Sequence, residues 1–178
     1  MLAAMAACSS LPTAPRDLVD DRTGITVSVV GAPIELERAP SGAAAHDFLT
    51  LVAVQQDDDG KYTALMLLYR WTVYYGGAAF LPESGSGELL IDVDGQSIDL
   101  QPLPRLPAGL PSAKDLFVPD TSESAMRAYV TDLATLRRIA SSRELIVRLP
   151  RETPQGSFTP WHDGRPQLEQ FVRHLSGS

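Results

Sequence analysis

Residues 47–75 read DFLTLVAVQQDDDGKYTALMLLYRWTVYY, and this stretch decides the fold. Two apolar runs, 47–56 and 62–75, flank an Asp-Asp-Gly sequence at 58–60 that suits a tight turn with glycine at positive φ. We therefore predict that the two runs pair as a β-hairpin. Both faces of the second run are apolar in its first half, which predicts a central strand covered on each side.

Further strands are predicted on either side of this hairpin. Apolar and polar residues alternate over 25–30, as in a half-buried strand, and 34–37 extends that strand. Residues 88–103 form a second hairpin that turns at Asp-Gly 94–95. Residues 102–119 contain five prolines, too many missing N–H donors for a regular element, and are predicted to form a long extended loop.

Two helices complete the predicted fold. A short helix over about 132–140, capped by Thr131 or Asp132, lies between two strands. The second covers about 166–175, has Pro166 in its first turn and is expected to lie over one face of the sheet. Its apolar residues recur at i, i+3, i+4 and i+7: Leu168, Phe171, Val172 and Leu175. The fold class is α+β, with a mainly antiparallel, β-sandwich-like sheet.

Cys8 is the only cysteine, so an intramolecular disulfide is excluded. Small residues surround it in the sequence MAACSS, with further apolar residues upstream. This pattern resembles the lipobox of bacterial lipoproteins. The resemblance implies that a signal peptidase cuts before Cys8 and that Cys8 carries a thioether-linked diacylglycerol and an acylated amine. Ser9 at the next position implies sorting to the outer membrane, facing the periplasm.

The chain is accordingly divided into three parts. Residues 1–7 are interpreted as a signal-peptide remnant; they are short and lack a cationic start, and we expect the natural start to lie upstream. Residues 8–22 are the lipidated cysteine and a flexible tether, and 23–178 are a single β-rich domain. The acyl chains would anchor the protein stably, whereas no apolar stretch is long enough for a membrane-spanning helix.

Composition excludes some partners. Hydrophobic residues make up 44% and charged residues 21%, as in ordinary globular proteins. The net charge is −7, and binding to nucleic acid needs clustered Lys and Arg, so no nucleic-acid partner is expected.

No catalytic or metal motif is found either. ESGSGE at 83–88 does not have the G-x-S-x-G register of a hydrolase elbow. The two Asp-rich turns lack calcium-loop spacing. The histidines, at positions 46, 162 and 174, are scattered and have no cysteine partner, so neither a metal site nor a cofactor is predicted.

The stretch FTPWHDGRP at 158–166 gathers an aromatic ring, an imidazole and a carboxylate before the last helix. His162 could act as a general base oriented by Asp163, but adjacent residues of an extended segment point in opposite directions. The favoured interpretation is that Asp163 caps the helix while Trp161 and Phe158 staple it to the sheet.

Aromatic residues also gather near the end of the long strand. We predict an interaction patch, for a protein or a glycan, from six residues of the two stretches: Trp71, Tyr74, Tyr75, Phe80, Trp161 and His162. The competing interpretation, core packing, applies particularly to Trp71.

Three functions are compatible with these features. The favoured one is a non-catalytic, lipid-anchored cell-envelope protein whose domain binds or scaffolds another component, so no enzyme is expected. The second is an envelope hydrolase that uses His162 or His46 with a carboxylate. The third is a carrier of a small apolar ligand, with a pocket between the sheet and the C-terminal helix.

Overall fold

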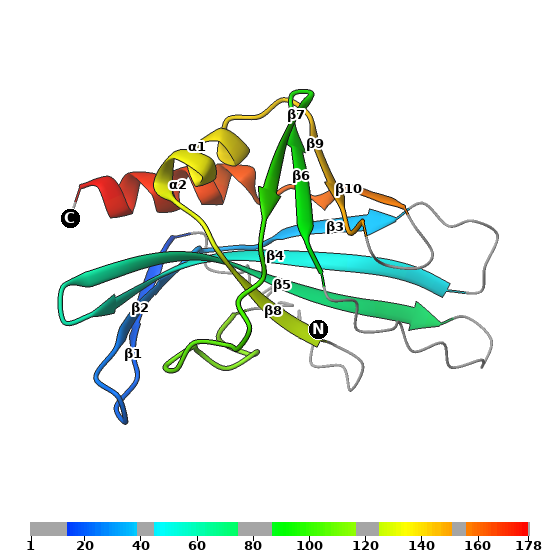
Figure 1. Cartoon of the computed structure of the whole chain (residues 1–178). Helices are drawn as coiled ribbons and strands as arrows, with labels where there is room; N and C mark the ends of the chain where they lie inside the picture. Colours follow the sequence, from blue (N-terminus) through cyan, green and yellow to red (C-terminus); the bar gives the residue numbers. More distant parts are fainter. Residues whose placement is uncertain (1–13, 39–44, 75–86, 117–124, 151–155, 178) are drawn as a thin grey trace, which may run out of the picture.

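The computed structural model describes residues 14–38, 45–74, 87–116, 125–150 and 156–177. Within these ranges the chain forms ten strands and two helices around one hydrophobic core (Figure 1). The strands and helices are β1 (Arg16–Val19), β2 (Thr26–Val29), β3 (Ile34–Arg38), β4 (Ala45–Asp58), β5 (Lys61–Tyr74), β6 (Leu89–Val93), β7 (Gln96–Leu100), β8 (Ala125–Val130), α1 (Leu133–Ala140), β9 (Leu145–Arg148), β10 (Ser157–His162) and α2 (Arg165–Ser176).

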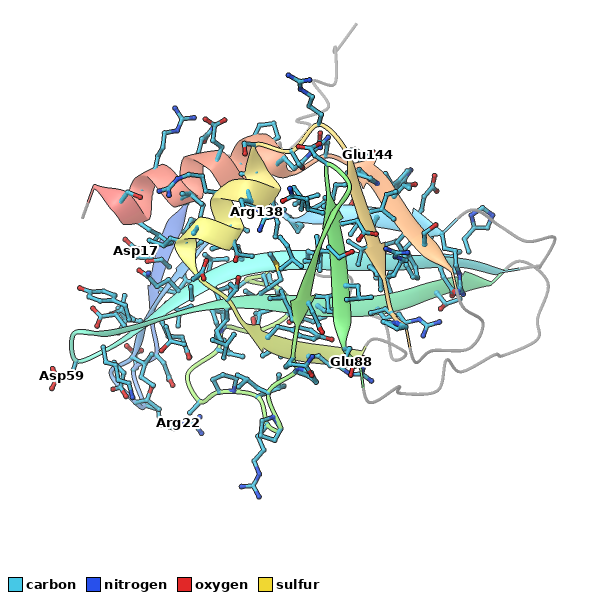
Figure 2. The ribbon with its side chains drawn as sticks, turned by 45° about the horizontal axis from the view of Figure 1, so that its top comes forward. Asp17, Arg22, Asp59, Glu88, Arg138 and Glu144 are labelled. Atoms are coloured by element: carbon cyan, nitrogen blue, oxygen red, sulfur yellow. The ribbon has the colours of Figure 1, made fainter. Side chains whose placement is uncertain are left out.

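The predicted hairpin is the longest feature of the sheet. β4 and β5 pair over fourteen residues each without a shift of register, from Ala45 opposite Tyr74 to Asp58 opposite Lys61. Asp59 and Gly60 make the turn with φ of 55° and 85°, the left-handed conformation that a two-residue hairpin turn of this kind requires. Asp59 projects from the hairpin tip (Figure 2). The hairpin prediction is confirmed, as is the second hairpin with its turn at 94–95.

The remaining strands extend from both edges of this hairpin. β2 and β3 lie end to end along β4, opposite 54–57 and 48–51 respectively, and β8 pairs with β5. From β3 the sheet continues through β10, β9 and β6 to β7. The α+β class and the largely antiparallel pairing are confirmed. A sandwich of two sheets is not, because all ten strands belong to one open sheet.

The two ends of this open sheet approach each other. An isolated bridge joins Pro102, just after β7, to Tyr129 of β8. The N–H of Leu103 donates to the carbonyl of Ala128 at 2.7 Å, and the buried Tyr129 hydroxyl donates to the carbonyl of Gly87 at 3.1 Å. The sheet therefore curls around an inner face.

Both helices cover the inner face (Figure 1). Asp132 caps α1 by accepting from the N–H of Thr135 at 2.6 Å, as predicted, and α2 has proline in its first turn. Leu168 of α2 packs against Ala53 and Met66, which are paired on β4 and β5. The predicted helix spans, 132–140 and 166–175, are confirmed to within one residue.

The proline-rich segment covers part of the outer face. Residues 102–116 form no helix or strand and lie on the side of the β4–β5 hairpin opposite the helices (Figure 1). The Gln56 side chain donates to the carbonyl of Ala108 at 2.7 Å, and Leu116 is fully buried. The long loop is confirmed over this range; the rest of the predicted range, 117–119, lies outside the described residues.

The N-terminal boundary needs a correction. The tether predicted for 8–22 is wrong over Arg16–Val19, which forms β1 and pairs with β2. The Arg16 guanidinium also donates to the carbonyl of Asp115. The sequence of this strand, RDLV, does not alternate polar and apolar residues, so it was not distinguished from a linker. Residues 8–13, including Cys8, lie outside the described residues. Neither described helix is long and apolar enough to cross a lipid bilayer.

Replacement of Leu168 should test how α2 is held. Leu168 is 2% exposed and meets the inner face, so Leu168→Ala should lower the free energy of unfolding by about 2–5 kcal/mol. The control Gln170→Ala, on the exposed side of the same helix, should change it by less than about 0.5 kcal/mol. Urea denaturation followed by circular dichroism measures both. Equal effects would show that α2 does not depend on this contact.

Candidate functional site

A row of aromatic rings lies on the outer face, on the part of the sheet formed by β10, β3, β4 and β5. We call it the aromatic strip and define it as His46, Phe48, Trp71, Trp161 and His162. The Phe48 ring stacks on Trp71 with centroids 4.2 Å apart and lies 5.1 Å from Trp161. Trp161 in turn stacks on His162 at 4.2 Å, and His46 lies 6.3 Å from Phe48.

The hairpin register positions the inner half of the strip. Phe48 and Trp71 are direct cross-strand partners, so their side chains share one face. The Trp71 Nε1–H donates to the hydroxyl of the fully buried Thr50 at 3.0 Å, which fixes the indole. Tyr69 lies opposite Thr50, and burial raises the pKa of Tyr69 to about 12. Phe48 and Trp71 are therefore a rigid, mostly buried support.

The outer half of the strip comes from β10. A bulge between Pro160 and His162 shifts the register against β3, so that His162 lies opposite Glu35. The Nδ1 of His162 lies 2.6 Å from the Oε2 of Glu35. Trp161 is 47% exposed and the His162 side chain 66% exposed. This half of the strip faces solvent.

A glycine allows β10 to approach β3 so closely at this point. A Cβ on Gly164 would lie 2.1 Å from the carbonyl oxygen of Pro33, a backbone atom that no side-chain rotation can move away. Only glycine fits between the end of β10 and the chain entering β3. Glu35 lies two residues after Pro33, and His162 lies two residues before Gly164. The close contact between Gly164 and Pro33 therefore holds His162 beside Glu35.

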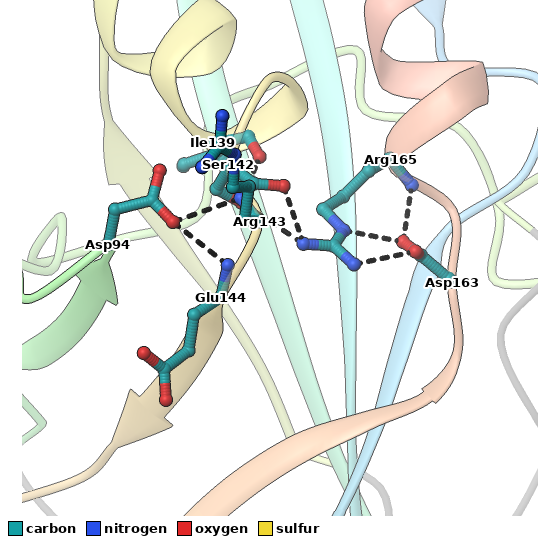
Figure 3. A network of polar contacts seen from close by, with 7 residues as sticks. All are labelled: Asp94, Ile139, Ser142, Arg143, Glu144, Asp163 and Arg165. Atoms are coloured by element: carbon teal, nitrogen blue, oxygen red, sulfur yellow. Dashed lines mark hydrogen bonds and ion pairs between the residues drawn. The ribbon is translucent and has the colours of Figure 1, made fainter.

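Arg165 ties the end of β10 to the start of α2. Its guanidinium donates from Nε and Nη2 to the two carboxylate oxygens of Asp163, at 2.8 and 2.7 Å, and from Nη1 to the carbonyl of Ser142 at 2.8 Å (Figure 3). The hydrogen bonds from Arg165 hold the pKa of Asp163 below its ordinary value, and Asp163 raises the pKa of Arg165. The residues after the strip are thus anchored on both sides of the junction.

A second carboxylate extends this network to the β6–β7 turn. Asp94 accepts hydrogen bonds from the backbone N–H groups of Glu144 and Arg143, each at 2.9 Å (Figure 3). These bonds lower the pKa of Asp94, the bond from Glu144 most strongly. Asp94 and Arg165 act as structural groups, since they join the β6–β7 turn, the α1–β9 loop and the start of α2.

Two interpretations of FTPWHDGRP are corrected. Asp163 is not the helix cap: the N-cap is Gly164, and Asp163 accepts instead from the backbone N–H and guanidinium of Arg165. Trp161 does not staple the helix to the sheet, because the bulge turns it outward, whereas Phe158 is 1% exposed. His162 contacts Glu35 rather than Asp163, as expected for adjacent residues that point in opposite directions.

The structure brings together half of the predicted patch. Trp71, Trp161 and His162 meet through Phe48. Tyr74 ends β5. Tyr75 and Phe80 lie outside the described residues, as does Cys8. Trp71 is 9% exposed, so its placement agrees with the core-packing interpretation, while Trp161 and His162 form the exposed part.

The sequence pattern did not indicate Glu35 or Phe48 as site residues. Glu35 is separated from His162 by 127 positions, and no local pattern signals a contact at that distance. Phe48 could have been found, because it follows the alternation of the first hairpin strand and the turn register pairs it with Trp71.

The other polar groupings of the described residues are structural or too small to hold a metal ion. Asp47, on the inner face, accepts from Arg38 and Arg70 and from the Thr72 hydroxyl, an arrangement that neutralises charges near the end of the core. Among the described residues no group of three or more His, Cys, Asp or Glu side chains is placed to hold a metal ion. The aromatic strip is therefore the candidate site.

No protein-family model, curated protein or solved structure matches this chain.

The Asp163–Arg165 contact predicts acid sensitivity. Because the folded pKa of Asp163 is depressed, its stabilising effect is present above the ordinary pKa of 3.8 and is lost as the pH falls through the lower folded value. Asp163→Asn should therefore be less stable than the natural chain at neutral pH, and the difference should shrink below pH 3.8. Urea denaturation over a pH series measures it.

Glu169→Gln serves as the control for that measurement. It removes an exposed carboxylate from α2 without touching Asp163 or Arg165. A difference between Asp163→Asn and the natural chain that stays constant into acid would contradict the assigned role of the Arg165 hydrogen bonds.

Proposed function

We propose that this protein is a non-catalytic, lipid-anchored cell-envelope protein, held at the membrane through Cys8, whose domain binds another envelope component through the aromatic strip. The observation that carries the binding role is Trp161, an indole 47% exposed on a strip of stacked rings with a buried base. Exposed aromatic rings with a rigid support are typical anchors of binding surfaces. The anchoring and location rest on the lipobox-like sequence around Cys8.

The packing of the core favours binding at the surface over carriage of an apolar ligand. The contact region between the inner face and α2, lined by Ile34, Leu51, Ala53, Met66 and Leu168, leaves no space for a water molecule. A carrier would need a cavity of several hundred Å³ there. The described residues thus fill the position at which a ligand pocket was expected under the carrier hypothesis.

The hydrolase alternative retains one supporting contact, the His162–Glu35 pair at 2.6 Å. A general base oriented by a carboxylate is part of many hydrolytic sites. Here the His162 side chain is 66% exposed to solvent. A general base and its carboxylate are most effective where water is excluded. His46 contacts Phe48 at the other end of the strip and lies opposite Val73.

The anchor is tested by metabolic labelling with a fatty acid. The natural chain, expressed from its genomic start, should incorporate the label, and Cys8→Ala should not, because the thioether and the acylated amine both require that cysteine. Label that survives in Cys8→Ala would contradict the anchor.

The binding role is tested by photo-crosslinking in cells. A photoreactive phenylalanine analogue at Ser157, exposed on β10 two residues from Thr159 and on the same face, should give a discrete crosslinked product that disappears when Trp161→Ala is added. The same analogue at Asp99, exposed on β7, is the matched control and should give no such product. A crosslinked product that persists in Trp161→Ala would show that the partner does not bind through the aromatic strip.

A further inference from the structure

The exposed end of the strip is rich in hydrogen-bond acceptors. Glu37 of β3 lies opposite Phe48 on one side and opposite Thr159 on the other, so its carboxylate shares the outer face with both. Trp161 lies 5.1 Å from the same Phe48 ring. Glu37, Thr159 and Trp161 therefore surround one short stretch of the sheet, with Glu35 and His162 next to it.

The carboxylate of Glu37 is not neutralised within the described part of the chain. No hydrogen bond or ion pair joins it to another described residue, whereas Glu35 is held by His162. The long-range field has the same sign, since the whole chain carries a net charge of −7. A cation approaching this surface meets a favourable potential.

We infer that this corner of the strip, formed by Glu37, Thr159 and Trp161, binds an arginine side chain of an envelope protein. The inference rests on the proposed function and specifies the class of its partner. A guanidinium carries five N–H donors and no acceptor, which complements a carboxylate and a hydroxyl. Its planar face stacks on indole, the best aromatic partner for a cation.

A neutral glycan fits this corner less well. Sugar hydroxyls both donate and accept, so a glycan site needs donors as well as acceptors. The two carboxylates here, Glu35 and Glu37, only accept, and the donors are limited to the Thr159 hydroxyl, the indole N–H of Trp161 and the ring of His162. A neutral glycan would also leave the negative charge of Glu37 uncompensated, whereas a guanidinium would compensate it.

Two tripeptides that differ mainly in charge test the inference. Acetylated and amidated Gly-Arg-Gly and Gly-citrulline-Gly are titrated into the full-length, ¹⁵N-labelled chain. The indole N–H signal of Trp161 reports on the site, and the backbone amide signal of Asp99, exposed on β7, is the internal reference. The arginine peptide should shift the Trp161 signal, and the citrulline peptide should shift it far less.

Matched variants locate the binding. Glu37→Gln should lower the affinity for the arginine peptide about two- to fivefold, the range for one exposed ion pair. Glu169→Gln, on the exposed side of α2, should leave that affinity unchanged. Trp161→Ala should abolish the shift of the Thr159 amide, whereas Tyr62→Ala, another exposed aromatic residue, should leave it unchanged.

The outcomes separate this inference from the proposed function. Three results would overturn the arginine assignment. The Trp161 signal shifts equally with the arginine and citrulline peptides, it does not shift at all, or Glu37→Gln and Glu169→Gln lower the affinity for the arginine peptide equally. A shift of Trp161 with an N-acetylglucosamine trisaccharide but not with the arginine peptide would also overturn it, yet would keep the strip as a binding surface. Failure of the strip as a binding surface is measured separately, by the crosslinking experiment at Ser157.

Discussion

The uninterrupted pairing of β4 with β5 is the constraint on which the rest of the structure depends. Fourteen residues pair on each side with no bulge, from the turn at Asp59-Gly60 to the far end. Because side chains alternate along a strand, one turn sets the face of every residue in the hairpin, and a slip of one position would exchange the two faces. Phe48 and Trp71 face outward, and Ala53 and Met66 face α2, for this single reason.

The β4–β5 hairpin is apolar on both faces, and a different part of the chain packs against each face. The helices cover the inner face, while residues 102–116 cover the outer face beside β2, where Gln56 binds the carbonyl of Ala108. Four prolines reduce the number of N–H donors that residues 102–116 must satisfy, which suits a segment that crosses apolar side chains without regular structure. The other part of the outer face carries the aromatic strip, and there Trp161 and His162 are exposed.

Local features were predictable from the sequence, and distant contacts were not. Turn residues identified both hairpins, and the apolar periodicity with proline and aspartate identified both helices. β10 was not predicted, because Pro160 and the bulge break its alternation, and β1 was too short to show one. In the candidate site, aromatic composition indicated Trp71, Trp161 and His162. The Glu35 contact depends on a close approach at Gly164 that appears only when β10 lies beside β3.

The placement of the strip on strands favours recognition over catalysis. Phe48 and Trp71 are held by cross-strand pairing and by the hydrogen bond from Trp71 to Thr50, and Trp161 and His162 by ring stacking and by the contact with Glu35. These contacts reduce the side-chain freedom that would be lost when a partner binds. The imidazole of His162 is exposed and already engaged by Glu35, which leaves neither an excluded-water site nor a free ring nitrogen on that side. Stacked rings beside the Glu37 carboxylate, which has no partner among the described residues, suit a complementary cation, because both attractive groups are in position before contact.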